Sequence, residues 1–248
     1  MNAANRNIKL IIAYDGTDFC GWQRQENDRT VQEEIENALE KMHGHPVNLS
    51  GSGRTDSGVH AAGQAANFHT DLRGINADRF APALNSLIAH DVRVLNAEET
   101  DHDFHARFSA KSRLYRYQFA ARDLLPHENR YHLKLYRQPR IDLLNAYGRL
   151  LLGETDCSIF AGAGDTSKSK NRYVHRAYFY MDKDILIFEI CANAFLRNMV
   201  RSTAGTFLHY AEKNTSPAEL KKIIASGDRS LAGPTLPPQG LFLWYVDY

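Results

Sequence analysis

The sequence has little cysteine, and its three cysteines, Cys20, Cys157 and Cys191, are far apart and form no CxxC pair. Thiols in this number and spacing exclude a disulfide framework and argue against a cysteine-based zinc site, as in a reducing compartment. No apolar run approaches the roughly 18 residues that a membrane-spanning helix needs. The first apolar run meets Asp15 and Gly16 at once, which predicts a strand and not a signal peptide. We therefore expect a cytoplasmic protein with no membrane partner.

Metal-binding motifs are also absent. The eleven histidines include no HExxH pattern. Asp56 could be combined with His60, His69 and either His102 or His105 into a metal site, but their spacing matches no known ligand pattern. We therefore expect no metal.

Net charge is nearly absent, at +1, yet the charges are unevenly distributed. Residues 1–104 carry nine Lys and Arg against 16 Asp and Glu, whereas residues 105–140 carry nine against two. This basic segment is also rich in tyrosine, and arginines interleaved with aromatic rings suit a nucleic-acid surface. A solvated cationic strand with its loop would have the same composition, so composition alone leaves both interpretations open.

Hydrophobic periodicity predicts two similar α+β lobes with mostly antiparallel strands, which we place at residues 1–107 and 108–248. A cleft between two such lobes is the natural ligand site. One helix has a candidate capping box at Thr30 and Glu33, and another has Pro217 at its first position. Helices are expected over 30–44, 76–90, 140–153, 196–214 and 216–228; strands over 8–14, 46–53, 63–70, 91–100, 112–121 and 240–248; and a hairpin over 174–195.

The loop 51–63, GSGRTDSGVHAAG, places one carboxylate among glycines. Asp56 by itself would be an ordinary turn former. Arg54 lies two residues away and can keep the carboxylate ionised, while the glycines leave room for a flat ligand. An ionised Asp with the ordinary pKa of about 3.9 is a weak base, so it suits nucleophilic attack or the stabilisation of a cation.

Further candidates lie on the basic strand and on a later helix. Tyr115 and Tyr117 are two apart and share one face of a strand, whereas Leu114 and Arg116 face the other way. We take Arg113 and Arg116 as candidate phosphate contacts. Arg201 shares a predicted helix face with Arg197, four positions earlier. Sheet packing or solvent exposure would explain each of these residues equally well when it is taken alone.

Five segments occur together in one order: YDGTDFCGWQRQ at 14–25, GRTDSGVHA at 53–61, DFHARFSAKSRLYRY at 103–117, ANAFLRNMVRSTAG at 192–205 and GLFLWYVDY at 240–248. Together they resemble the tRNA pseudouridine synthase A family over nearly the full chain. The resemblance implies a fold of two similar ferredoxin-like α+β lobes that share a long, mainly antiparallel sheet. It also implies that the protein needs no metal and no cofactor and forms a homodimer.

The implied activity is the isomerisation of uridine to pseudouridine in the anticodon stem-loop of tRNA. By motif match, Asp56 would be the catalytic aspartate and Arg201 the basic partner of its carboxylate. Tyr115 would stack on the flipped uracil, and Arg54 would help to displace the target base. Flipping the base out of its stack costs a few kcal/mol, which phosphate contacts offset.

The chain departs from the family pattern at a few positions. Leu114 stands where a basic residue is common, and Arg197-Asn198 replaces histidines. Residues 162–176 match weakly, and their glycine and lysine content predicts a mobile RNA-contacting loop. Two other functions are weighed: a tRNA-binding protein without catalysis on the same fold, and a small-molecule enzyme that uses Asp56. The basic segment argues against the latter.

Overall fold

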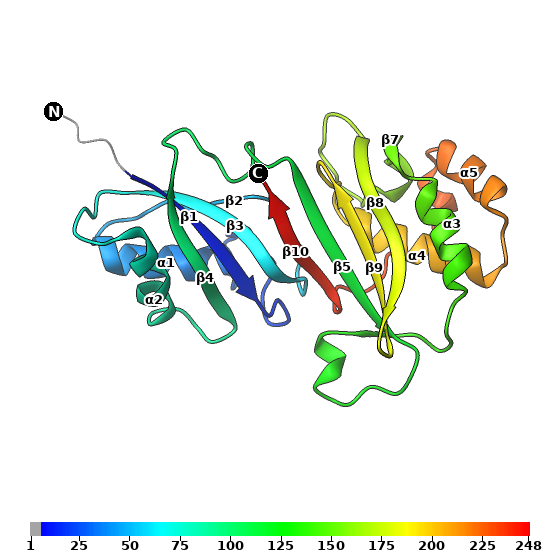
Figure 1. Ribbon diagram of the computed structural model, residues 1–248, viewed down its shortest axis with the longest axis horizontal. Coiled ribbons are helices and arrows are strands. Elements are labelled where there is room, and N and C mark those ends of the chain that lie inside the picture. Colours follow the sequence, from blue (N-terminus) through cyan, green and yellow to red (C-terminus); the bar gives the residue numbers. More distant parts are fainter. Residues whose placement is uncertain (1–5) are drawn as a thin grey trace. The chain divides into compact units, whose positions relative to one another are not determined.

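The computed structural model describes residues 6–248, which divide into two compact units (Figure 1). The first comprises the residues up to Lys111 together with Phe242–Tyr248, and the second comprises Ser112–Leu241. In each unit most strand pairs are antiparallel, and helices accompany the strands. The predicted α+β class is therefore confirmed, while the predicted boundary between residues 107 and 108 stays a prediction.

The first unit is built around β1, whose neighbours β3 and β4 both pair with it in antiparallel register. Alternate residues of β1 are buried, as the period of a half-buried strand predicts: Ile8, Leu10 and Ile12 are fully inaccessible. Helices α1 and α2 lie against one face of this sheet (Figure 1), and the rings of Phe68 and Phe80 join β3 to α2 at 5.4 Å. The elements are β1 (Arg6–Tyr14), α1 (Val31–His43), β2 (Ser50–Gly51), β3 (His60–Thr70), α2 (Phe80–Asn85), β4 (Val92–Thr100) and β10 (Leu241–Asp247).

The last strand of the chain returns to the first unit. β10 pairs with β3 in parallel register, with Phe242 opposite His60 and Leu243 opposite Ala61. β2 pairs with β3 in antiparallel register. The strand β3 therefore pairs with β1, β2 and β10, and the loop that joins β2 to β3 begins and ends at paired strands.

The second unit has the strand order β5-β9-β8-β7, with β6 parallel to β5. Its core is aromatic: the rings of Phe179 and Phe188 stack at 4.4 Å, and Phe207 of α4 meets Tyr147 of α3 at 5.7 Å. Burial of each such side chain contributes about 1.5–3 kcal/mol. The elements are β5 (Ser112–Ala120), β6 (Leu133–Lys134), α3 (Ile141–Arg149), β7 (Gly153–Asp156), β8 (Asn171–Asp182), β9 (Ile185–Ala192), α4 (Met199–Glu212) and α5 (Pro217–Ala225).

Helix ends show where local sequence signals succeed and where they fail. The predicted cap of α5 is confirmed, since the Ser216 hydroxyl accepts from the Glu219 N–H at 3.2 Å. The predicted capping box of α1 is wrong: Thr30 forms no side-chain cap, and its buried hydroxyl has no hydrogen-bond partner. Thr30 is 1% exposed, so its side chain is buried in the fold and does not cap the helix.

The helix expected over 76–90 is shorter than predicted. A 3-10 turn, Ala77–Arg79, precedes α2, which stops at Asn85. The Asn85 amide donates to the Val94 carbonyl and accepts from the Val94 N–H, both at 2.8 Å. These two bonds join the end of α2 to β4. Within residues 6–248, none of the helices is both long and apolar enough to span a bilayer.

Candidate active site

Asp56 lies on the loop between β2 and β3 of the first unit. Its carbonyl accepts from the Val59 N–H at 3.1 Å, which closes a turn with Gly58 in the left-handed region, at φ +76°. The Asp56 side chain is half-buried. Arg54 is exposed, and its Nε donates to Oε1 of Gln23 at 3.2 Å. A short carboxylate on a closed turn has little freedom, so its direction follows from the backbone.

The segment 14–22 packs against this turn and is hydrogen-bonded to it. The Trp22 N–H donates to the Thr55 carbonyl at 3.2 Å, and the Tyr14 and Thr55 hydroxyls are hydrogen-bonded at 2.8 Å. Gly21 has φ +88°, and a Cβ there would lie 2.5 Å from the Thr55 carbonyl oxygen. The residue before Asp56 can therefore rest on residue 21 only if that residue is glycine.

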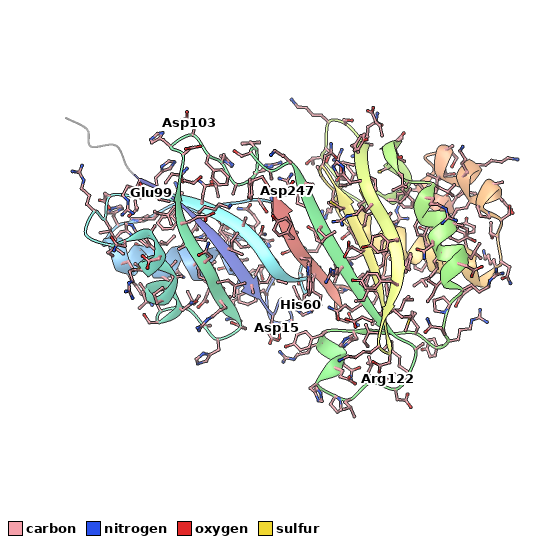
Figure 2. The ribbon with its side chains drawn as sticks, viewed as in Figure 1. Asp15, His60, Glu99, Asp103, Arg122 and Asp247 are labelled. Atoms are coloured by element: carbon pink, nitrogen blue, oxygen red, sulfur yellow. The ribbon has the colours of Figure 1, made fainter. Side chains whose placement is uncertain are left out.

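Both ends of the loop are fixed by buried polar residues. Gln64 of β3 accepts from the Ser52 hydroxyl at 2.6 Å and donates to the Gly53 carbonyl at 2.9 Å. At the other end, His60 is fully buried, with its ring stacked on Phe242 at 4.6 Å. Its Nδ1 lies 3.2 Å from the Asp15 carboxylate (Figure 2). Sequence reasoning missed Gln64, whose spacing of 12 residues from Ser52 gives no local signal.

Tyr115 lies on β5 of the second unit and is 9% exposed. Its ring meets that of Phe195 edge-on, with centroids 4.9 Å apart. Tyr117 shares its face, as the period of two predicts, and is fully buried. The Tyr117 hydroxyl donates to the Pro237 carbonyl. Burial raises the pKa of Tyr117, and the charge of Arg201 partly opposes that rise.

Arg201 lies in the first turn of α4, which begins at Met199. Its Nε donates to the Leu236 carbonyl at 2.7 Å, and its Nη1 donates to the Asn198 side-chain oxygen at 3.0 Å. Two bonds from different edges fix the plane of a guanidinium, because its donors form a rigid fork. Sequence reasoning missed the Leu236 contact, which joins residues 35 positions apart.

The two candidate phosphate contacts differ in their surroundings. Arg113 donates from Nη1 to the Asn193 carbonyl at 2.8 Å. Arg116 lies on the opposite face of β5 from Tyr115 and donates from Nε to the Glu189 carboxylate at 2.9 Å. The Glu189 side chain is only 3% exposed and also accepts from the Tyr178 hydroxyl at 2.8 Å. Arg116 therefore compensates a buried negative charge.

The predicted residues thus form two groups. Asp56 and Arg54 share one loop of the first unit, while Tyr115, Arg113, Arg116 and Arg201 belong to β5 and α4 of the second. Of the histidines that the sequence offered as metal ligands, His69 and His102 lie side by side, with ring centroids 5.2 Å apart, while the His105 ring meets Phe108 at 4.5 Å. Across residues 6–248 no three His, Cys, Asp or Glu side chains gather as a ligand set.

Comparison with known proteins first defines a class of enzyme. A family model for tRNA pseudouridine synthase matches residues 10–109 and 148–248, which include the Asp56 loop and α4 but not β5. Sequence relatives agree with this match. The tRNA pseudouridine synthase A of Treponema denticola is 52% identical over 98% of this chain and 93% of its own length. That of Treponema pallidum (strain Nichols) is 49% identical over 92% of this chain and 84% of its own.

A more distant bacterium shows the same full-length similarity. The tRNA pseudouridine synthase A of Caldicellulosiruptor saccharolyticus is 42% identical over 98% of this chain and 100% of its own length. The chain belongs to the tRNA pseudouridine synthase family. The resemblance inferred from the sequence is confirmed, and the protein is an isomerase that acts on uridine in tRNA.

Proposed function

We propose that this enzyme converts uridine to pseudouridine in the anticodon stem-loop of tRNA, with Asp56 as its catalytic carboxylate. The observation that carries the proposal is the fixed backbone around Asp56. The Val59 N–H donates to the Asp56 carbonyl, the Trp22 N–H donates to the Thr55 carbonyl, and Thr55 packs against Gly21. The carboxylate is half-buried on this turn. Such a group is pre-oriented for attack, which lowers the entropy cost of reaching the transition state.

The chemistry needs one carboxylate and a base that has left its stack. The Asp56 carboxylate adds to C1′ of the sugar, abstracts the C2′ proton to form a glycal, or adds to C6 of uracil. In each route the glycosidic bond breaks, the freed uracil turns, and C5 bonds to C1′ while the C5 proton is released. N1 of the product carries a proton in place of the one lost from C5, and in the glycal route the C2′ proton is returned. The product is therefore an isomer of uridine, and the reaction consumes no cofactor.

Other residues take supporting roles in this proposal. Arg201 supplies the cation for the Asp56 carboxylate, Tyr115 stacks on the flipped uracil, and Arg54 helps to displace the target base. Planar rings and guanidinium groups suit these roles because both stack on bases. The enzyme works in the cytoplasm, as a homodimer and without a nucleotide cofactor. Basic residues of the segment 105–140, Arg113 among them, contact phosphates.

Tritium release from tRNA that carries 5-tritiated uridine tests the catalytic role. Wild-type protein should release the label, whereas Asp56→Asn should release none yet bind tRNA with unchanged affinity. The matched control is Asp71→Asn, which removes a carboxylate of the same unit that contacts His45 at 3.2 Å. Release by Asp56→Asn would contradict the role of Asp56. Tight binding without release by the wild type would favour a non-catalytic tRNA-binding protein.

Mapping of pseudouridine along the tRNA tests the proposed substrate. Reverse transcription after carbodiimide treatment stops next to each pseudouridine, so the modified positions can be read directly. We expect stops within the anticodon arm only. Modification elsewhere would contradict the substrate assignment and leave the role of Asp56 intact.

A further inference from the structure

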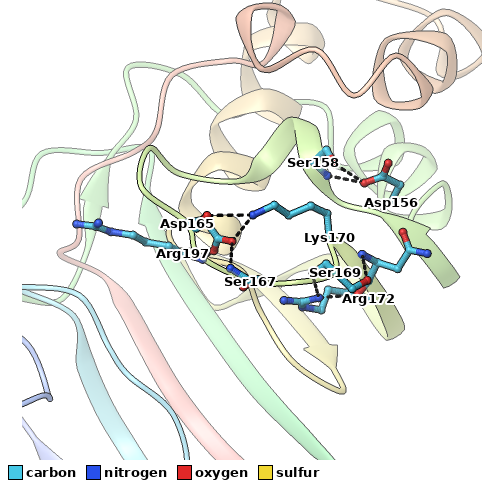
Figure 3. A network of polar contacts seen from close by, with 9 residues as sticks. Asp156, Ser158, Asp165, Ser167, Ser169, Lys170, Arg172 and Arg197 are labelled. Carbon is cyan, nitrogen blue, oxygen red and sulfur yellow. Dashed lines mark hydrogen bonds and ion pairs between the residues drawn. The ribbon is translucent and has the colours of Figure 1, made fainter.

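A buried carboxylate outside the residues assigned above lies in the second unit, in a segment that we call the 162–172 loop. The Asp165 side chain is 5% exposed and forms an ion pair with Nζ of Lys170 through Oδ1 (Figure 3). Lys170 also donates to the Asp165 carbonyl at 3.2 Å, and the Ser167 N–H donates to Oδ1 at 3.0 Å. One carboxylate thus organises its own loop.

The same carboxylate reaches beyond its loop to the segment before α4. Oδ2 of Asp165 accepts from the Arg197 N–H at 2.7 Å, over a separation of 32 residues (Figure 3). The Gly162 N–H donates to the Arg197 carbonyl at 2.8 Å. The loop therefore holds both the donor and the acceptor of one backbone residue, which fixes the orientation of that residue.

The next residue carries this orientation to Arg201. Asn198 has a left-handed backbone at φ +60°, and its side-chain oxygen accepts from Nη1 of Arg201 at 3.0 Å. A Cβ on Gly162 would lie 2.7 Å from Nδ2 of Asn198, so the loop backbone also touches this amide. Contacts thus run without a gap from Asp165 through Arg197 and Asn198 to the guanidinium of Arg201.

We propose that Asp165 is a positioning residue for Arg201, acting through the Arg197 backbone and the Asn198 side chain. The proposal rests on the role given to Arg201 above. A carboxylate suits the task because charge-assisted hydrogen bonds are short and strong, and because its two oxygens accept from opposite sides. Lys170 balances the buried charge. Burial acts to raise the pKa of Asp165, but the Lys170 ion pair and the N–H groups of Arg197 and Ser167 hold it below its usual range.

This role assigns a function to a segment for which the sequence predicted a mobile RNA contact. Lys170, one of the lysines behind that expectation, pairs inward with Asp165. The loop is then a support for α4 and not merely a surface for phosphate. A chain of hydrogen bonds of this kind can be worth more than the sum of its parts, so removal of one member weakens the others.

The test compares two isosteric variants, Asp165→Asn and Asp156→Asn. Asp156 is the matched control, because its Oδ1 accepts both the N–H and the hydroxyl of Ser158, at 2.9 and 2.6 Å (Figure 3). An amide has one oxygen, which suffices at 156. At position 165 one oxygen must serve both the Oδ1 and the Oδ2 donors, so an amide cannot serve them all.

We expect Asp165→Asn to lower kcat about tenfold, because a small misplacement of a catalytic group costs at least that much. The KM for tRNA should match that of Asp156→Asn. The melting temperature should be lower for Asp165→Asn, because Lys170 loses its partner, so kcat is compared at a temperature at which both variants are folded. The NMR signal of Nε–H of Arg201 should shift in Asp165→Asn only. In an Asn198→Ala background, the side-chain contact between Asn198 and Arg201 is already lost. Asp165→Asn should therefore lower kcat by a smaller factor there than in the wild type.

Equal kcat values for the Asp165→Asn and Asp156→Asn variants would overturn the positioning role, as would full additivity with Asn198→Ala. A loss of kcat that only mirrors a lower melting temperature, with the Arg201 signal unmoved, would also overturn it. Arg201→Gln, measured in parallel, distinguishes the proposed role of Arg201 from the proposed role of Asp165. Normal turnover in Arg201→Gln would contradict the proposed role of Arg201 itself. An inactive Arg201→Gln beside a fully active Asp165→Asn would leave that role standing and remove only the inference on Asp165.

Discussion

The first unit presents Asp56 by fixing its backbone, whereas the second unit presents Arg201 by hydrogen bonds to the guanidinium group of its side chain. Around Asp56 the decisive contacts are a Trp22 N–H, a Thr55 carbonyl and a glycine with no side chain. Around Arg201 they are the Asn198 amide and the Leu236 carbonyl. The two groups proposed to act together in one reaction are thus held at different points, Asp56 at its backbone and Arg201 at the end of its side chain.

The difference follows from the side chains themselves. An aspartate has two rotatable bonds, so a fixed backbone almost fixes its carboxylate. An arginine side chain has about 2 kcal/mol of rotamer entropy, so a fixed backbone still leaves many positions open to its guanidinium group. Hydrogen bonds at the guanidinium are needed to hold it. We therefore expect the first unit to be sensitive to added volume and the second to lost polar groups.

The largest effect is expected for Gly21→Ala. A Cβ at residue 21 meets the Thr55 carbonyl at 2.5 Å, and φ is +88°, a conformation that costs a residue other than glycine about 1–3 kcal/mol. The turn must shift, and Asp56 shifts with it. We expect kcat for pseudouridine formation to fall about a hundredfold. The melting temperature should fall as well, which calorimetry measures.

Two glycines of the same unit provide controls. A Cβ on Gly74 or on Gly53 would meet nothing within 4 Å, and neither position has a positive φ. Gly74→Ala should match the wild type in kcat and melting temperature. Gly53→Ala, next to Arg54, should keep its stability; lower activity there would mean that the space serves the RNA. Normal activity in Gly21→Ala would contradict the view that backbone packing positions Asp56.

A smaller effect separates the two arginines of β5. Arg113→Gln should reduce the slope of log affinity against log salt by about 1 if Arg113 contacts phosphate. Arg116→Gln should leave the slope unchanged, because Arg116 already pairs with the buried Glu189 at 2.9 Å. It should instead lower the free energy of unfolding by on the order of 2 kcal/mol, since Glu189 loses its nearest cation and keeps only the Tyr178 hydroxyl and the more distant Arg176, at 3.8 Å.

Chemical denaturation measures the free energy of unfolding of each variant, and salt titrations of tRNA binding measure the slope. The double variant Arg116→Gln/Glu189→Gln restores charge balance and should recover much of the stability that Arg116→Gln loses. A reduced salt slope for Arg116→Gln would show that Arg116 serves phosphate despite its ion pair. An unchanged slope for Arg113→Gln would place Arg113 away from the RNA backbone.

Local sequence predicted those features that depend on neighbours in the chain. The alternation of Ile8, Leu10 and Ile12 identified a half-buried strand, and Ser216 identified the start of α5. Contacts between distant segments carry no such signal: the Asp165 carboxylate meets Arg197 across 32 residues. The capping box at Thr30 failed for the same reason, because tertiary burial overrode a local motif. The motifs therefore located the Asp56 loop, while the groups that hold it emerged only from the fold.

The smallest effect compares one thiol from each unit. Burial raises the pKa of Cys157, in the second unit, to about 12, so very little of this thiol is ionised at pH 8. Cys20, in the first unit, is half-exposed, and its pKa is raised mainly by its hydrogen bond to Asp28, at 3.4 Å. Iodoacetamide at pH 8 should therefore label Cys20 well before Cys157, as peptide mass spectrometry would show.

Asp28→Asn sharpens this comparison. The amide keeps an acceptor oxygen but loses the negative charge that favours the protonated thiol, so the pKa of Cys20 should fall and its labelling at pH 8 should accelerate, by about twofold. Cys157 should be unaffected, since its protection comes from burial in the second unit. Labelling of Cys157 at the rate of Cys20 would show that the second unit opens locally around β7.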